Sequence, residues 1–208
     1  MAARARAAGP AARFLGSRTL LWALLAAPGV WMLIAWWRGA TFYGEVLHAS
    51  GELAVQLLIA TMAVTPLALM FPRARLTQWL RRRRRYLGVA TFGYSLMHTV
   101  VYLARQADLG VILEDARSVA IWTGWIALIL MLALAVTSND ASIRWLRRRW
   151  HRLHRLVYVA AILTLAHWIL TAFDPTSAWV YAGILVAVQL VRVGASLWHR
   201  RARRPAAS

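Results

Sequence analysis

Long apolar runs recur along this chain, and short polar segments separate them. Each run is 19 to 22 residues long, close to the roughly 20 residues with which an α-helix crosses a hydrocarbon core of about 30 Å. Helices are expected because a spanning segment must satisfy its own backbone amides. The pattern therefore predicts an all-α fold, a six-helix transmembrane bundle. The predicted spans are residues 19–37, 51–71, 86–104, 118–136, 153–173 and 177–198.

Two tails rich in Ala and Arg flank these runs and carry no apolar period. We therefore predict cytoplasmic tails at residues 1–18 and 199–208 around one membrane domain at residues 19–198. The first run is longer than the apolar region of a signal peptide and ends in an aromatic and basic anchor, so we expect it to be retained. No Gly-rich phosphate loop follows a strand pattern, so no nicotinamide-binding domain is expected within the chain.

The charges are divided unevenly among the predicted loops. The net charge is +18, and all 25 basic residues are Arg, a usage typical of a GC-rich bacterial genome. With the N-terminus inside, 22 of the arginines lie on the cytoplasmic side, whereas six of the seven acidic residues lie on the other side or at its boundary. This positive-inside bias predicts a multi-pass protein of the bacterial inner membrane with both termini in the cytoplasm. Arginines at such a surface meet the anionic lipid bilayer, and no nucleic-acid partner is expected.

Two histidines fall within predicted spans, where ionisable groups are costly and indicate function. His98 lies about 12 residues into its span from the cytoplasmic side and His167 about 14 residues into its own, roughly 18 and 21 Å deep at the helical rise. Imidazoles at matched depth on separate helices can bind one iron from both faces of a porphyrin. The chain has no Cys, which excludes thiolate ligands. The pattern favours a haem between His98 and His167 over isolated histidines that bond to neighbouring helices.

His154 lies at the cytoplasmic end of the fifth span, thirteen residues before His167. On an ideal helix the two side chains would point some 140° apart, so they suit two sites at different depths better than one. A second imidazole for an inner site is not evident, because Arg84 and Arg85 stand where it would be expected. These arginines could instead bind haem propionates there. We interpret the other histidines as surface groups: His48, His151 and His199. His151 is also an alternative inner ligand.

Short motifs match a known family in order along the chain. They are Thr65-Pro66-Leu67, Arg84-Arg85-Tyr86-Leu87-Gly88, His98 with Tyr102, Leu134-Ala135-Val136-Thr137-Ser138, Leu153-His154-Arg155-Leu156-Val157-Tyr158 followed by His167, and Tyr181-Ala182-Gly183. On these residues the chain resembles the MsrQ (YedZ) family, over about residues 50–195. Members of this family are haem-binding membrane subunits of bacterial periplasmic methionine sulfoxide reductase systems. They belong to the ferric-reductase-like transmembrane domains, together with the eukaryotic NADPH oxidases.

The resemblance implies a cofactor set and a site. Haem b is implied, one or two per chain, with FMN as a further candidate carrier. His98, His154 and His167 correspond to haem-associated histidines of the family, and the first and last form the outer pair. The broader oxidase group has another His where this chain has Arg84, which follows the MsrQ pattern.

The resemblance also implies an electron path and partners. Electrons would enter from the quinone pool or a cytoplasmic flavin reductase. They would leave to a periplasmic molybdopterin enzyme, MsrP, which reduces methionine sulfoxide in oxidised proteins. The chain would be an electron-transfer subunit, with catalysis on the partner. Docking is expected at the outer acidic residues Asp108, Glu114 and Asp115.

Two other functions remain open for the same sequence. One is a stand-alone transmembrane haem cytochrome that reduces ferric chelates or quinones. The other is a cofactor-free membrane assembly or transport protein, which explains the arginines but not the matched depth of His98 and His167.

Overall fold

The computed structural model describes residues 17–106, 109–115 and 117–202, and within these ranges it contains helices and no strand. Most of both predicted tails, and Asp108, lie outside the described residues. The helices are α2 (Arg18–Trp37), α3 (Tyr43–Met70), α4 (Arg75–Arg105), α5 (Leu109–Asp115), α6 (Val119–Val136), α7 (Asp140–Leu146), α8 (Arg148–His154), α9 (Val157–Thr171) and α10 (Thr176–Ala202).

Six helical segments are long and apolar enough to cross a membrane, which confirms the predicted all-α, six-helix fold. Each of the six predicted apolar runs falls on one of them. The spanning segments are Arg18–Trp37, Tyr43–Met70, Arg75–Arg105, Val119–Val136, Arg148–Thr171 and Thr176–Arg200.

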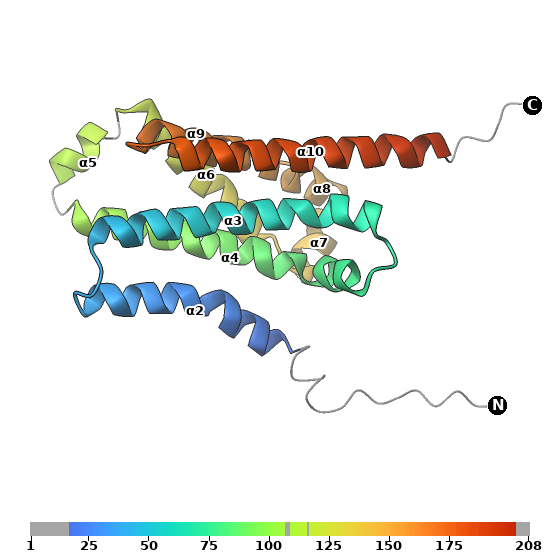
Figure 1. The fold of residues 1–208 in the computed structure, drawn as a ribbon, viewed down its shortest axis with the longest axis horizontal. Coiled ribbons are helices and arrows are strands. Elements are labelled where there is room, and N and C mark those ends of the chain that lie inside the picture. Colours follow the sequence, from blue (N-terminus) through green and yellow to red (C-terminus); the bar gives the residue numbers. More distant parts are fainter. Residues whose placement is uncertain (1–16, 107–108, 116, 203–208) are drawn as a thin grey trace, which may run out of the picture.

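The long helices run side by side, so the bundle has two chemically different ends (Figure 1). One end holds the start of α2, the α3–α4 connection, α7, α8 and the end of α10, and we call it the arginine-rich end. The opposite end holds the α2–α3 connection, α5 and the α9–α10 turn, and we call it the acidic end. The first spanning helix, α2, therefore begins at the same end of the bundle at which the last one, α10, ends, as an even number of spans requires.

The second spanning helix, α3, begins earlier than the apolar run 51–71 predicted. The amide of Phe42 donates to the Glu45 carboxylate over 3.3 Å, which closes the first turn of α3 at Tyr43. Polar residues before position 51 are therefore helical, and His48 lies on α3 and not in an outer loop. His48 is exposed, as its interpretation as a surface group predicts, but the expectation that it lies in an outer loop is wrong.

The predicted span 153–173 is not one continuous helix, because α8 ends at His154 and α9 begins at Val157, and a further break precedes α8. Arg147 takes a left-handed backbone conformation, with φ of 49°, and separates α7 from α8. A second turn follows His154, where the amide of Tyr158 donates to the Arg155 carbonyl over 3.2 Å. His154 is the last residue of α8, so the helical angle predicted between it and His167 does not apply.

α3 lies at the centre of the bundle, and the buried core follows one of its faces. Ala160 and Ala161 of α9 are fully buried in the same core cluster as the apolar residues of α3. Met131 of α6 and Leu165 of α9 complete the contact. This packing fixes α3, α6 and α9 around the space in which the candidate site lies.

Candidate functional site

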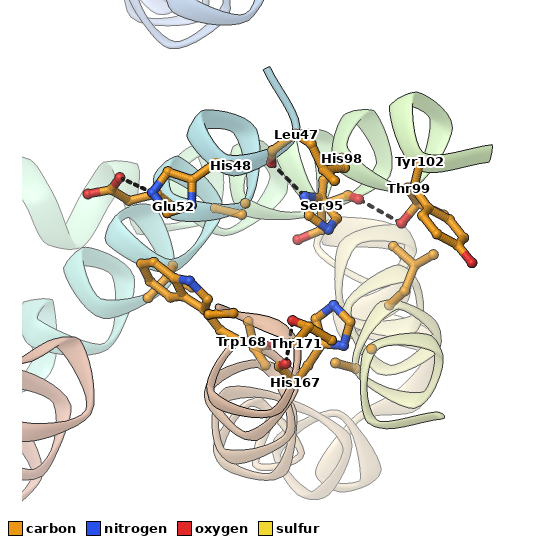
Figure 2. A pocket seen from close by; sticks show the side chains of 18 of the residues that line it. Leu47, His48, Glu52, Ser95, His98, Thr99, Tyr102, His167, Trp168 and Thr171 are labelled. Carbon is orange, nitrogen blue, oxygen red and sulfur yellow. Dashed lines mark hydrogen bonds and ion pairs between the residues drawn. The ribbon is translucent and has the colours of Figure 1, made fainter. Parts of the chain in front are cut away.

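A cavity of about 390 Å³ lies between α3, α4, α6 and α9, in the part of the bundle nearer the acidic end. His98 projects into it from α4 and His167 from α9 (Figure 2). Apolar side chains form much of the remaining wall, among them Val55 and Leu128. The two histidines that were predicted to lie at matched depth therefore share one apolar cavity.

The distance between the two imidazoles suits a shared metal. Their ring centroids are 6.2 Å apart, and the ring planes are nearly perpendicular, at 89°. Metal–imidazole bonds are about 2 Å long, so two rings that bind one metal through facing nitrogens have centres about 6 Å apart. The centroid separation of His98 and His167 is close to this value.

The hydrogen bonds of the two rings leave the same nitrogen free. Nδ1 of His98 lies 2.9 Å from the Leu47 carbonyl oxygen, and Nδ1 of His167 lies 2.7 Å from that of Ala120. A carbonyl oxygen only accepts, so each Nδ1 carries the hydrogen and each Nε2 keeps its lone pair. A bond from the second ring nitrogen to a backbone carbonyl is how proteins orient metal-binding histidines.

The donor set fits haem better than a bare metal ion. Among the described residues, no group of three or more His, Asp or Glu side chains could enclose a metal. Haem iron needs only two axial ligands, and its macrocycle is apolar, like the wall of this cavity. His98 and His167 could therefore supply both ligands from the protein.

A polar network borders the cavity on the side of α10. Glu52 accepts a hydrogen bond from the Tyr181 hydroxyl over 2.8 Å and another from Gln56 over 3.1 Å, and its second oxygen lies 3.5 Å from Nε2 of His48. Trp168, the neighbour of His167, stacks on Tyr181. The sequence pattern had placed Glu52 only at a membrane boundary. Its position inside an apolar run was the signal that could have identified it.

At the acidic end, Tyr102 of the cavity lining joins α4 to α5. The Tyr102 hydroxyl donates to Asp115 Oδ2 over 2.7 Å, and Gln106 donates to the same oxygen over 3.3 Å. Asp115, one of the predicted docking residues, is therefore engaged within the chain. Glu114 is exposed on α5, and Asp108 lies outside the described residues.

A second cavity of about 140 Å³ lies nearer the arginine-rich end, and Met131 lines both cavities. The predicted inner residues Arg84, Arg85 and His154 all line it. Arg84 donates to the Thr65 hydroxyl over 3.2 Å, and Arg85 pairs with Asp140 over 2.8 Å. The structure thus brings the three predicted inner residues to one place.

His154 is held differently from the other two histidines. Its Nε2 lies 3.1 Å from the Thr137 hydroxyl, which already donates its hydrogen to the Ala133 carbonyl over 2.7 Å. Nε2 of His154 is therefore the donor, and the nitrogen that is free in His98 is engaged here. The ring also stacks on Trp150, with centroids 3.9 Å apart. Among the described residues, His154 is the only imidazole that lines this cavity.

Arg85 and Asp140 form an exposed ion pair between α4 and the start of α7. The hydrogen bond from Arg85 and its positive charge lower the pKa of the Asp140 carboxyl from its ordinary value of 3.8. Asp140 is the one acidic residue that the sequence pattern placed among the cytoplasmic arginines. The pair fastens α7 beside the inner cavity.

Comparison with known proteins gives a consistent family. The model of the ferric reductase like transmembrane component matches residues 50–165. Similar curated proteins carry the name protein-methionine-sulfoxide reductase heme-binding subunit MsrQ. One from Brucella anthropi is 38% identical over 162 residues, which cover 76% of this chain and 70% of that protein. One from Rhizobium meliloti is 36% identical over 168 residues, covering 77% and 76%. No solved structure matches the chain.

The family match bears on location as well. Together with the six apolar helices, a match to a transmembrane component shows that the chain is a multi-pass membrane protein.

Proposed function

Because this chain belongs to the MsrQ family of heme-binding subunits of protein-methionine-sulfoxide reductases, within the ferric reductase like transmembrane components, we propose that it binds haem b between His98 and His167 and conducts electrons across the bacterial inner membrane. The observation that carries the proposal is the pair of imidazoles 6.2 Å apart with both Nε2 atoms free. When bound, haem supplies an iron that gains and loses one electron at a time.

The residues of the chain hold and orient the group. His98 and His167 supply the two nitrogens, and the Leu47 and Ala120 carbonyls keep the Nδ1 hydrogens in place. The apolar wall excludes water, which favours neutral imidazoles at this depth. One haem per chain is proposed, because His154 offers neither a free Nε2 nor a second imidazole.

The direction of transfer follows from the two ends of the bundle. We place the arginine-rich end and both termini in the cytoplasm and the acidic end in the periplasm, in accord with the positive-inside rule. Electrons from the quinone pool or a cytoplasmic flavin reductase would then leave near Tyr102 to a periplasmic molybdopterin enzyme, MsrP. No FMN site is included in the proposal, because the names of the relatives mention heme alone.

Electron transfer through purified protein in vesicles tests this function. The protein is loaded with haem, inserted in lipid vesicles and supplied with a reduced quinone analogue, with ferricyanide outside as the acceptor. We expect reduction of ferricyanide with the wild type and its loss with His98→Ala and His167→Ala. His199→Ala is the control, because His199 lies at the far end of α10 and bonds to the Leu69 carbonyl. Equal rates in vesicles with and without protein would contradict the proposal.

A further inference from the structure

The two candidate ligands rest on the same local arrangement, formed twice from different helices. His98 of α4 bonds to a carbonyl of α3, and His167 of α9 bonds to a carbonyl of α6. In each case the residue four positions after that carbonyl is a glycine: Gly51 follows Leu47, and Gly124 follows Ala120. Residues four apart lie on one face of a helix, so carbonyl and glycine face the same ring.

The hydroxyl next to each glycine repeats as well. Ser50 donates to the Leu47 carbonyl over 3.0 Å, and Thr123 donates to the Ala120 carbonyl over 2.6 Å. Each carbonyl therefore receives a hydroxyl from three positions on and an imidazole from the neighbouring helix. Each support therefore contains a hydroxyl residue followed directly by glycine: Ser50-Gly51 in α3 and Thr123-Gly124 in α6.

Neither glycine can be replaced without moving the imidazole. A Cβ atom on Gly51 would lie 2.9 Å from Nδ1 of His98. A Cβ on Gly124 would lie 2.8 Å from both Nδ1 and Cε1 of His167. These contacts are closer than van der Waals distance, and in both rings they involve the nitrogen that bonds to the carbonyl.

We infer that Gly51 and Gly124 are positioning residues that set the tautomer and the plane of the two haem-binding imidazoles. The part of this inference that concerns haem binding rests on the proposed function. Each glycine lets the Nδ1–Cε1 edge of its ring approach the neighbouring helix, so that Nδ1 reaches the carbonyl and Nε2 stays free. The two supports sit on different helix pairs, and the ring planes meet at 89°.

Electron paramagnetic resonance of the ferric haem protein reads this orientation directly. Perpendicular imidazole planes give a strongly anisotropic low-spin signal, whereas nearly parallel planes give a rhombic one. We expect the anisotropic signal in the wild type and its loss or shift in Gly51→Ala and Gly124→Ala. Haem affinity should fall about 10- to 100-fold, as for other groups that orient a metal ligand. An unchanged signal in both variants would overturn the inference while leaving haem binding intact.

Two other glycines supply matched controls. Gly93 of α4 has nothing within 4 Å of an added Cβ, so Gly93→Ala tests the substitution alone. Gly29 of α2 has the same kind of close contact, 3.1 Å to Cε1 of Tyr94, but at the contact between α2 and α4. Both control variants should keep the wild-type signal. A signal changed by Gly29→Ala as much as by Gly51→Ala would show a general packing effect and contradict a positioning role.

A second measurement needs no haem and remains decisive if a variant folds poorly. In haem-free protein, thermal unfolding is compared for Gly51→Ala, His98→Ala and the double variant. If Gly51 acts through the imidazole, Gly51→Ala lowers the unfolding temperature of the wild type but not that of His98→Ala, where the ring is gone. An equal loss in both backgrounds would refute the inference. If the wild type binds no haem, the proposed function fails, and this cycle still tests the glycine.

Discussion

Tyr181 of α10 donates its hydroxyl hydrogen over 2.8 Å to Glu52 of α3, which lines the cavity that holds His98 and His167. This bond joins the last helix to the central one beside the candidate haem site. It also places a carboxylate inside a predicted membrane span, where such a group is costly and indicates function. The relationship leads to a prediction about the reduction potential.

Glu52→Gln should raise the midpoint potential of the haem by an amount on the order of tens of millivolts. A nearby carboxylate stabilises the ferric state, so its removal favours the ferrous one. The measurement is a redox titration of purified protein at one pH. Glu45→Gln is the control, since Glu45 lies in the first turn of α3 and caps that helix. A potential that stays the same or falls would show that the Glu52 charge does not act on the site.

Glu114→Arg should slow electron transfer to the periplasmic partner and leave the haem spectrum unchanged. Glu114 is exposed on α5 at the acidic end, and its charge would steer a partner with a basic surface. Rates are measured as a function of salt, because screening should reduce the difference between wild type and variant.

Asp115 provides the contrast in the same helix. Its carboxylate accepts from Tyr102 and Gln106, so Asp115→Asn should also disturb the cavity lining at Tyr102. For the Glu114 prediction, equal electron-transfer rates in wild type and Glu114→Arg at low salt would show that the charge on α5 does not act in docking.

The Asp140 carboxyl should titrate below pH 3.8, its ordinary pKa, because Arg85 donates a hydrogen bond to it and carries a positive charge. A lowered pKa means that the pair stabilises the protein above pH ~4 and that this contribution is lost as the pH falls through the lowered pKa. The carboxyl is fully exposed, so the effect on stability is small. Nuclear magnetic resonance of the carboxyl carbon gives the midpoint. Arg85→Gln should return it toward 3.8, and an unchanged midpoint would contradict the ion pair.

Much of the architecture could be predicted from the apolar pattern, because a hydrocarbon core fixes how many residues a helix needs to cross it. The same reasoning gave the matched depth of His98 and His167, since depth along parallel helices follows from counting residues. It also grouped Arg84 and Arg85 with His154, and all three line the inner cavity in the structure.

What the pattern missed depends on hydrogen bonds between residues that carry no apolar signal. The Glu45 bond to the Phe42 amide extends α3 and makes His48 helical. The left-handed Arg147 and the turn at Arg155 break the segment before α9. The opposite tautomers of His98 and His154 depend on carbonyl and hydroxyl partners from other helices, which residue counting cannot supply.

The central claim is that one haem is held between His98 and His167, and a reduced-minus-oxidised absorbance spectrum of purified protein with haem supplied in full tests it most directly. We predict about one haem b per chain in the wild type, a stoichiometry set by one pair of free Nε2 atoms. His98→Ala and His167→Ala should each lose the low-spin spectrum, whereas His154→Ala should keep it. A wild type that binds no haem, or a spectrum that survives both substitutions, would contradict the claim.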